Sequence, residues 1–270
     1  LTSVDDDRDI THDPAAPVRA AACRALGRIG SDEAAEPLTR LALESEDAPV
    51  RAAACRALGR IGSEAVLRRM LEALGDRRAS ARSGAALALG QIGDRRAVAP
   101  LLDAMSDEYS SVRWRAVQAL GVIRAEEAQE ILGAALTDED WAVRREACIA
   151  LGLIGSGAVV KPLIEALKDG YSSVRRAACE ALARMEGDRY TDAIRSALKD
   201  STSSVRRAAL KGLCVKRPPD LHDVLARVIR DSDEEVREEA CEALGNVGDA
   251  EAWDALMGAL CDAALRVRRK

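Results

Sequence analysis

The sequence predicts an all-α protein, a right-handed solenoid built from about eight repeats of two helices. Three observations lead to this fold class. Ala and Leu supply 52 and 30 of the 270 residues and Phe is absent, and these small aliphatic residues are good helix formers. A short motif returns every 31 residues along most of the chain. No apolar run approaches the roughly 20 residues that span a bilayer, so we expect no membrane segment.

The repeat is anchored by a Val-Arg pair. The first spacing is 32 residues and the next seven are 31 residues each. The Val of the pair stands at Val18, Val50, Val112, Val143, Val174, Val205, Val236 and Val267, with Ala81 in the remaining place. An Asp precedes the Val by five residues and a Leu follows it by eight in almost every unit. A pattern kept in so many columns indicates one structural unit repeated along the chain.

The first helix of each unit begins at the Val-Arg pair. In the sixth unit, Val174, Ala178 and Leu182 recur at helical spacing, which predicts a helix over 173–185. The corresponding helix of the fifth unit ends in the glycine-rich segment 151–155. Glycine there can adopt the left-handed conformation that terminates helices.

A second, shorter helix follows within each unit, for example over 159–168. In three units a proline falls in its first turn, where a missing N–H costs little: Pro37, Pro100 and Pro162. The Asp of the repeat then closes the unit. We expect it to bond backbone amides and the Arg of the next Val-Arg pair, forming an Asp–Arg ladder along the stack.

Neither helix could bury its apolar face alone, so the units must stack on one another. Five cysteines share one column of the repeat with Ala, Val and Leu, which makes that column part of the core: Cys23, Cys55, Cys148, Cys179 and Cys241. Stacked helices lie roughly 10 Å apart, too far for disulfides between neighbours. Cys214 and Cys261 lie outside the column. Free thiols predict a reducing, cytoplasmic setting.

The unit Asp-x-x-x-x-Val-Arg-x-x-Ala-x-x-Ala-Leu-Gly-x-Ile-Gly resembles the HEAT-like repeat of the phycobilisome-lyase type, in the HEAT and armadillo superfamily of α-solenoids. The resemblance covers residues 13–270, as eight helix pairs and the start of a ninth in a single solenoid, after an acidic lead over 1–12. It implies an interaction scaffold, a bilin lyase or a deoxyhypusine hydroxylase. Because solenoids normally end in polar capping repeats, we expect this chain to be part of a longer protein.

The sequence lacks the residue patterns of the common catalytic and metal sites. Deoxyhypusine hydroxylases hold iron through repeated His-Glu pairs, but the only histidines here are His12 and His222, followed by Asp13 and Asp223. No Cys-x-x-Cys pair and no phosphate-binding glycine motif occurs. The sequence therefore predicts no catalytic residue, no cofactor and no metal.

Aromatic residues gather at the turns between units. Tyr109, Trp141 and Tyr171 occupy this position in three successive repeats, and Trp114 lies one helical turn beyond Tyr109. Because turns are usually polar, this aromatic edge is a candidate contact surface, although the rings could instead cover the ends of neighbouring helices. Beside it we expect a basic strip of Arg115, Arg145, Arg176 and Arg207.

The second helices offer another surface, which the resemblance places on the concave side. One column there is basic at one end and acidic at the other. It comprises Arg68, Glu130, Lys161, Asp192, Asp223 and Asp254, and Arg69 stands beside the first of them. A polarised groove of this kind suits a protein or peptide better than a continuous phosphate backbone, although a merely solvated face is the alternative.

The seventh unit departs most from the repeat. Over 213–220, Lys216 replaces the apolar Ile, and Pro218 and Pro219 follow it. Because proline cannot continue a helix, we expect a local kink or a changed superhelical angle there.

Taken together, these features predict a non-enzymatic scaffold that binds a partner protein or peptide through the second-helix face and the aromatic, Arg-rich edge. A bilin lyase or chromophore chaperone is one alternative, which rests on the repeat resemblance alone. Nucleic-acid binding along the Arg-rich edge is the other. The net charge of −5, from 45 acidic and 40 basic residues, disfavours it.

Overall fold

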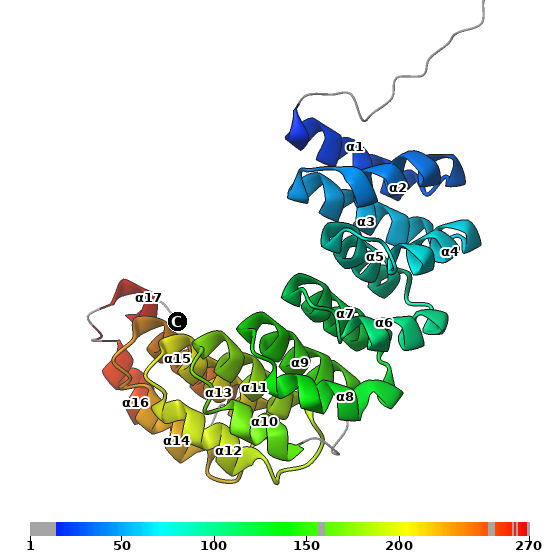
Figure 1. Ribbon diagram of the computed structural model, residues 1–270. Coiled ribbons are helices and arrows are strands. Elements are labelled where there is room, and N and C mark those ends of the chain that lie inside the picture. The colour runs from blue at the N-terminus through cyan, green and yellow to red at the C-terminus, as the bar shows by residue number, and fades with distance from the viewer. Residues whose placement is uncertain (1–14, 156–159, 248–251, 261, 263, 269–270) are drawn as a thin grey trace, which may run out of the picture. The chain divides into compact units, whose positions relative to one another are not determined.

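Helices, joined by turns and short loops, make up the computed structural model, which describes residues 15–155, 160–247, 252–260, 262 and 264–268; strands are absent from this part of the chain. The chain divides into two compact units between Leu132 and Gly133. Each unit is a stack of helix pairs, and Figure 1 shows successive pairs side by side within a unit. The predicted α-solenoid of two-helix repeats is confirmed.

Within unit 1, each first helix packs against the first helix of the next pair, so that α1, α3, α5 and α7 form one layer and the second helices another. The helices are α1 (Ala16–Ile29), α2 (Ala35–Glu44), α3 (Ala48–Ile61), α4 (Glu64–Ala73), α5 (Ala79–Ile92), α6 (Val98–Ala104) and α7 (Ser110–Ile123). Helix α8 (Gln129–Ala134) spans the division.

Unit 2 repeats the arrangement, with the layer of first helices formed by α9, α11, α13, α15 and α17. Its helices are α9 (Trp141–Ile154), α10 (Val160–Ala166), α11 (Ser172–Arg184), α12 (Thr191–Ser196), α13 (Ser203–Lys216), α14 (Leu221–Val228), α15 (Glu234–Val247), α16 (Ala252–Ala259) and α17 (Leu265–Arg268). Short 3-10 turns extend several second helices, for example Ala135–Thr137 after α8.

Helix ends follow the glycine signal. Gly155 ends α9 with a φ of 81°, and its N–H donates to the carbonyl of Leu151. In the seventh repeat Arg217 takes this left-handed place with a φ of 49°. Helix α13 ends at Lys216, and Pro218 and Pro219 lie in the loop after it. The local kink or changed superhelical angle expected there stays a prediction. The Lys216 ammonium, in place of the apolar side chain, donates to the carbonyls of Met185 and Gly187.

Close backbone approach explains the small residues of the repeat. A Cβ placed on Gly152 of α9 would lie 2.8 Å from the Cα of Ala181 in α11, and Gly90 faces Ala119 in the same way in unit 1. The Ala, Leu and Cys columns are buried, and Cys148 and Leu182 have no exposed surface. Small side chains therefore fill these contacts, although one aromatic ring, that of Tyr190, is also buried, at 1% exposed.

The Asp–Arg ladder is present, but its direction differs from the prediction. Arg175 donates through Nε and Nη2 to Asp200, which closes its own unit, at 2.7 and 2.8 Å. Its Nη1 donates instead to the main-chain carbonyl of Asp169, which precedes it. Such rungs include Arg82–Asp107, Arg144–Asp169, Arg175–Asp200, Arg206–Asp231 and Arg237–Asp262. Each Asp carboxylate thus pairs with the preceding Arg, not with the next one.

Candidate protein-interaction surface

Two aromatic rings stack on the surface of unit 2. Tyr171 caps the N-terminus of α11, and Trp141 is the first residue of α9. Asp169 fixes the Tyr171 backbone, because its carboxylate accepts the Tyr171 N–H at 2.8 Å. The ring centroids lie 5.7 Å apart with an interplanar angle of 18°. Trp141 is 37% exposed and Tyr171 is 53% exposed. This Trp141–Tyr171 pair is an apolar platform of the kind that protein partners contact.

Arginines frame the platform, and their charges are already paired. The guanidinium of Arg144 lies 5.7 Å from the Tyr171 ring centre and that of Arg145 lies 5.5 Å from the Trp141 ring centre. Arg144 holds Asp169 in two hydrogen bonds, and Arg145 bonds Glu146 at 2.5 Å. The rings are more exposed than these paired groups, since the Arg144, Asp169 and Glu146 side chains are only 15%, 11% and 5% exposed.

Tyr109 and Trp114 belong to unit 1. Tyr109 caps α7 and is 51% exposed, with the Arg82 guanidinium 5.7 Å from its ring centre. Trp114 is half-buried, and the guanidinium of Arg115 stacks on it at 3.9 Å. One aromatic edge that joins these residues to Trp141 and Tyr171 therefore stays a prediction.

Arginines of the predicted basic strip form ion pairs with neighbouring carboxylates. Arg176 pairs with Glu180 at 3.8 Å, and Arg207 bonds Glu235. Arg115 lies one position later in the repeat than the other three arginines and donates to the side chain of Gln118 at 2.8 Å. Since a phosphate backbone would have to displace the carboxylates, this pairing disfavours nucleic acid.

Six residues of the second-helix column and its neighbour are exposed, namely Arg68, Arg69, Glu130, Lys161, Asp192 and Asp223. The side chain of Asp254 lies outside those that the structure describes. Arg69 contacts Glu72 at 3.7 Å, one turn along α4. The column is thus solvent-accessible wherever it is described, while one groove across both units stays a prediction.

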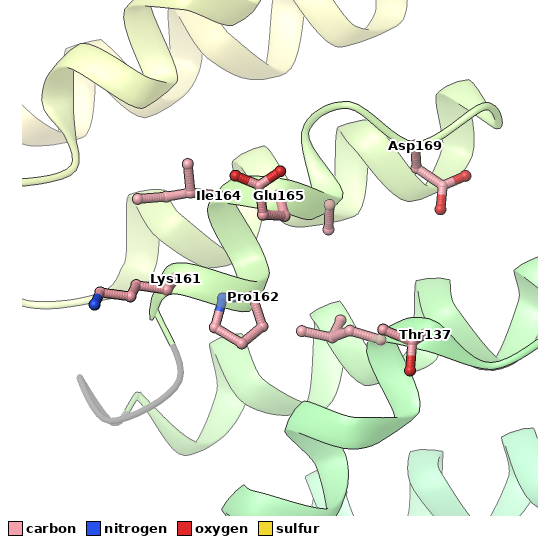
Figure 2. A pocket seen from close by; sticks show the side chains of 8 residues that line it. Thr137, Lys161, Pro162, Ile164, Glu165 and Asp169 are labelled. Carbon is pink, nitrogen blue, oxygen red and sulfur yellow. The ribbon is translucent and has the colours of Figure 1, made fainter.

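A groove of 620 Å³ in unit 2 lies where α10 meets the 3-10 turn after α8. It is lined by Leu136, Thr137, Lys161, Pro162, Ile164, Glu165, Ala166 and Asp169. Figure 2 shows Pro162 pointing toward the segment that carries Thr137, while the charged ends of Lys161 and Glu165 point away from it. The groove therefore has an apolar floor and charged rims. Because Asp169 also bonds the Tyr171 backbone, the groove adjoins the Trp141–Tyr171 pair.

Only Lys161 among these lining residues was predicted as part of a site. Pro162 and Ile164 look like ordinary second-helix residues in the sequence, and the proline was interpreted only as a helix starter. Neither residue breaks the repeat pattern, so the sequence offers no signal that separates them from other second-helix residues.

The thiols of the core column are shielded. Burial raises the pKa of Cys148 and of Cys179 to about 12, and both are fully buried. Burial also raises the pKa of Cys214, but this residue is only half-buried. Cys261 lies outside the described residues.

We therefore expect iodoacetamide to label Cys214 in the native protein while Cys148 and Cys179 react only after unfolding in urea. Peptide mass spectrometry after timed labelling would measure both rates, with the urea-unfolded chain as the reference for full reactivity. Labelling of Cys148 as fast as Cys214 in the native state would contradict the packing of the cysteine column.

Metal and membrane features are absent from the part of the chain that the structure describes. No cluster of three or more His, Cys, Asp or Glu side chains that could hold a metal ion occurs among those residues. No helix there is both long and apolar enough to cross a bilayer.

Similarity to known proteins agrees with the helix pairs. The family model described as HEAT repeats matches residues 8–84, 68–139, 130–213 and 191–270. The chain resembles the solved structure of Escherichia coli YibA with a TM-score of 0.69 and 23% identity, over 92% of this chain and 93% of that one. An engineered protein gives a TM-score of 0.51 and 22% identity over 96% and 84%.

The complex of CpcE and CpcF of phycocyanin lyase from Nostoc sp. PCC7120 gives a TM-score of 0.51 and 19% identity, over 88% of this chain and 93% of that one. No curated protein sequence matches the chain. At these identities the structural likeness shows the fold alone. Since the overlapping family matches extend from residue 8 to residue 270, this chain belongs to the HEAT-repeat family.

Proposed function

We propose that this HEAT-repeat protein is a binding scaffold that holds a partner protein or peptide across the Trp141–Tyr171 pair and the adjoining groove of α10. The exposed stacked rings carry the proposal, because large aromatic side chains left on a surface are typical anchors of protein interfaces. Stacked helix repeats commonly present such extended binding surfaces.

The groove supplies the specificity in this proposal. Its lining includes the apolar Ile164, with a positive charge at Lys161 and a negative one at Glu165. A peptide segment with an apolar residue flanked by charged ones complements these groups. Glu165 also bonds Lys168 at 3.0 Å, so the acidic rim is held in place.

Replacing Trp141 and Tyr171 together by Ala is expected to weaken binding of the partner about 30-fold or more, the effect of losing an interfacial hot spot of about 2 kcal/mol. A pull-down with the wild-type chain would identify the partner, and titration with the purified partner would then measure both affinities. Ile164→Glu tests the groove separately.

Val215→Ala is the matched control, because Val215 is also exposed in unit 2, at 69%, but belongs to neither surface. It should leave the affinity unchanged. If the aromatic double variant binds as tightly as the wild type, the pair is not the anchor. If Ile164→Glu also binds normally, the partner uses another face.

A further inference from the structure

A second pocket, of 240 Å³, lies among the first helices of unit 1. It is lined by Ala48, Arg51, Ala52, Cys55, Ser80, Ser83, Gly84, Leu87, Ser111 and Arg115, from three successive helices. Gly84 contributes no side chain to fill it. Two of the ten lining residues are arginines, three are serines and none is acidic.

Arg51 and Asp76 hold the ladder places of the second repeat, but their side chains do not form the rung. Its Nη1 donates to the carbonyls of Ser45 and Glu46 at 2.7 Å, as the other ladder arginines do to theirs. Its Nε and Nη2, however, meet no carboxylate among the residues that the structure describes. Asp76, which should accept them, lies 25 residues further on, as in the intact rungs, but it accepts hydrogen bonds from Arg78 instead.

The cause of the break is visible in the sequence. Two residues after the ladder Asp, the intact rungs carry Tyr, Thr, Asp or Ala, whereas the residue here is Arg78. Its backbone N–H donates to the Asp76 carboxylate at 2.8 Å and its guanidinium at 3.2 and 3.3 Å. The same backbone bond occurs in intact rungs, for example at Asp169 and Asp200, so the difference is the Arg78 guanidinium. The outer edge of the Arg51 guanidinium lacks the bidentate partner found elsewhere.

Arg115 brings a second guanidinium to the same pocket. Burial raises the pKa of Cys55, which lines the pocket, to about 12, and the charges of Arg115 and Arg51 are the first two that oppose this rise. Both guanidinium groups therefore act electrostatically on the same thiol, and both line the same pocket as Cys55. Ser80 adds a hydroxyl at the start of α5, and Ser83 bonds the Ser111 carbonyl at 3.1 Å.

We propose that this pocket binds a carboxylate carried by a peptide segment, with Arg51 as the bidentate donor and Arg115 as the second positive charge. The ligand's carboxylate takes the role that Asp plays in the intact rungs, where the same guanidinium edge holds two oxygens at 2.6 to 3.1 Å. The proposal is independent of the partner surface of unit 2, because every lining residue lies in unit 1.

Titration of the full chain, observed by NMR at the arginine Nε–H groups, tests the site. Acetyl-Gly-Glu-Gly-amide supplies a side-chain carboxylate, and acetyl-Gly-Gly-Gly with a free C-terminus supplies a terminal one. We expect at least one of them to shift the Arg51 resonance along a saturable curve, and the stronger one identifies the source. Arg51→Lys should weaken this binding about tenfold, because Lys keeps the charge but loses the bidentate fork.

Two further variants separate binding from folding. Ser80→Asp places a carboxylate at an exposed position of the pocket wall, where a helix start tolerates it, and should abolish binding. Arg60→Gln, in the last turn of the same helix and outside the lining, should leave binding unchanged. The proposal is overturned if neither peptide shifts Arg51, if acetyl-Gly-Gly-Gly-amide shifts it equally, or if inorganic phosphate binds more tightly than both. A shift of the free Arg51 resonance by Asp76→Asn would also overturn it, since Arg51 would then already be paired.

Discussion

Substitution of Gly152 by Ala is expected to lower the free energy of unfolding by about 2–3 kcal/mol, the usual cost of overpacking a close contact. The added Cβ would lie 2.8 Å from the Cα and 3.0 Å from the Cβ of Ala181. The backbone of Ala181 cannot rotate away from this contact as a flexible side chain could. Helices α9 and α11 must therefore separate, which loosens the leucines and cysteines that pack on either side of the contact.

Gly245 provides the matched control, because it occupies the same position of the repeat in α15 and no described atom lies within 4 Å of its Cβ site. Gly245→Ala should raise the stability by up to about 1 kcal/mol, since Ala is the better helix former. Urea denaturation followed by circular dichroism measures both. Equal effects of the two substitutions would show that helix propensity, and not the approach of α9 to α11, determines the outcome.

The repeat period is why so much of the fold could be predicted. Each unit has a Val-Arg start and a Gly-rich end, and the columns between them fix which residues are buried. Helix α11 accordingly lies within one residue of its prediction at each end. The second helix predicted over 159–168 ends two residues early, since α10 ends at Ala166, and 3-10 turns complete several other second helices.

The ladder direction could not be read from the spacing alone. Asp169 is six residues before Arg175 but 25 residues after Arg144, and proximity along the chain favoured the nearer arginine. In the folded unit the chain returns along the second helix to the end where the first helix began, so the distant arginine meets the carboxylate. The nearer arginine reaches only the carbonyl of Asp169, at 2.8 Å.

The candidate site was predicted in part for a similar reason. Tyr171 and Trp141 stood out because rings at turn positions break the pattern, and these two do stack on the surface. The groove residues Pro162 and Ile164 keep the pattern, so nothing in the sequence distinguishes them. The pocket beside Arg51 depends on Asp76 pairing with the Arg78 side chain and not with Arg51, and the spacing of the repeat alone favours neither arginine.

Replacing Arg175 by Met is expected to cost about 3 kcal/mol of stability, near the lower end for breaking a buried ion pair. The Arg175 and Asp200 side chains are only 14% and 10% exposed, so the deletion leaves a largely desolvated carboxylate without its partner. It also removes the hydrogen bond from Nη1 to the Asp169 carbonyl.

Low pH is expected to remove the stability that the Arg175–Asp200 ion pair contributes. The hydrogen bond from Arg175 lowers the pKa of Asp200, against the opposing effect of burial. A carboxyl group with a lowered folded-state pKa contributes its stability above the unfolded pKa of about 3.9, and loses it as the pH falls through the folded value. The difference in stability between the wild type and Asp200→Asn, measured by urea denaturation, should therefore be full at pH 7 and shrink below about pH 4.

Arg176 provides the control for the substitution of Arg175 by Met, because it follows Arg175 directly but pairs with Glu180 at the surface. The Arg176 and Glu180 side chains are 48% and 37% exposed. Arg176→Met should change the stability by less than about 0.5 kcal/mol, as expected for an exposed pair within one helix. Arg175 bonds both Asp200 of its own repeat and the Asp169 carbonyl of the preceding one. The contrast therefore decides whether these buried bonds stabilise the stack of repeats. If the two substitutions cost the same, the stacked apolar columns alone hold α11 to its neighbours, and the Asp–Arg rungs contribute nothing beyond an ordinary surface ion pair.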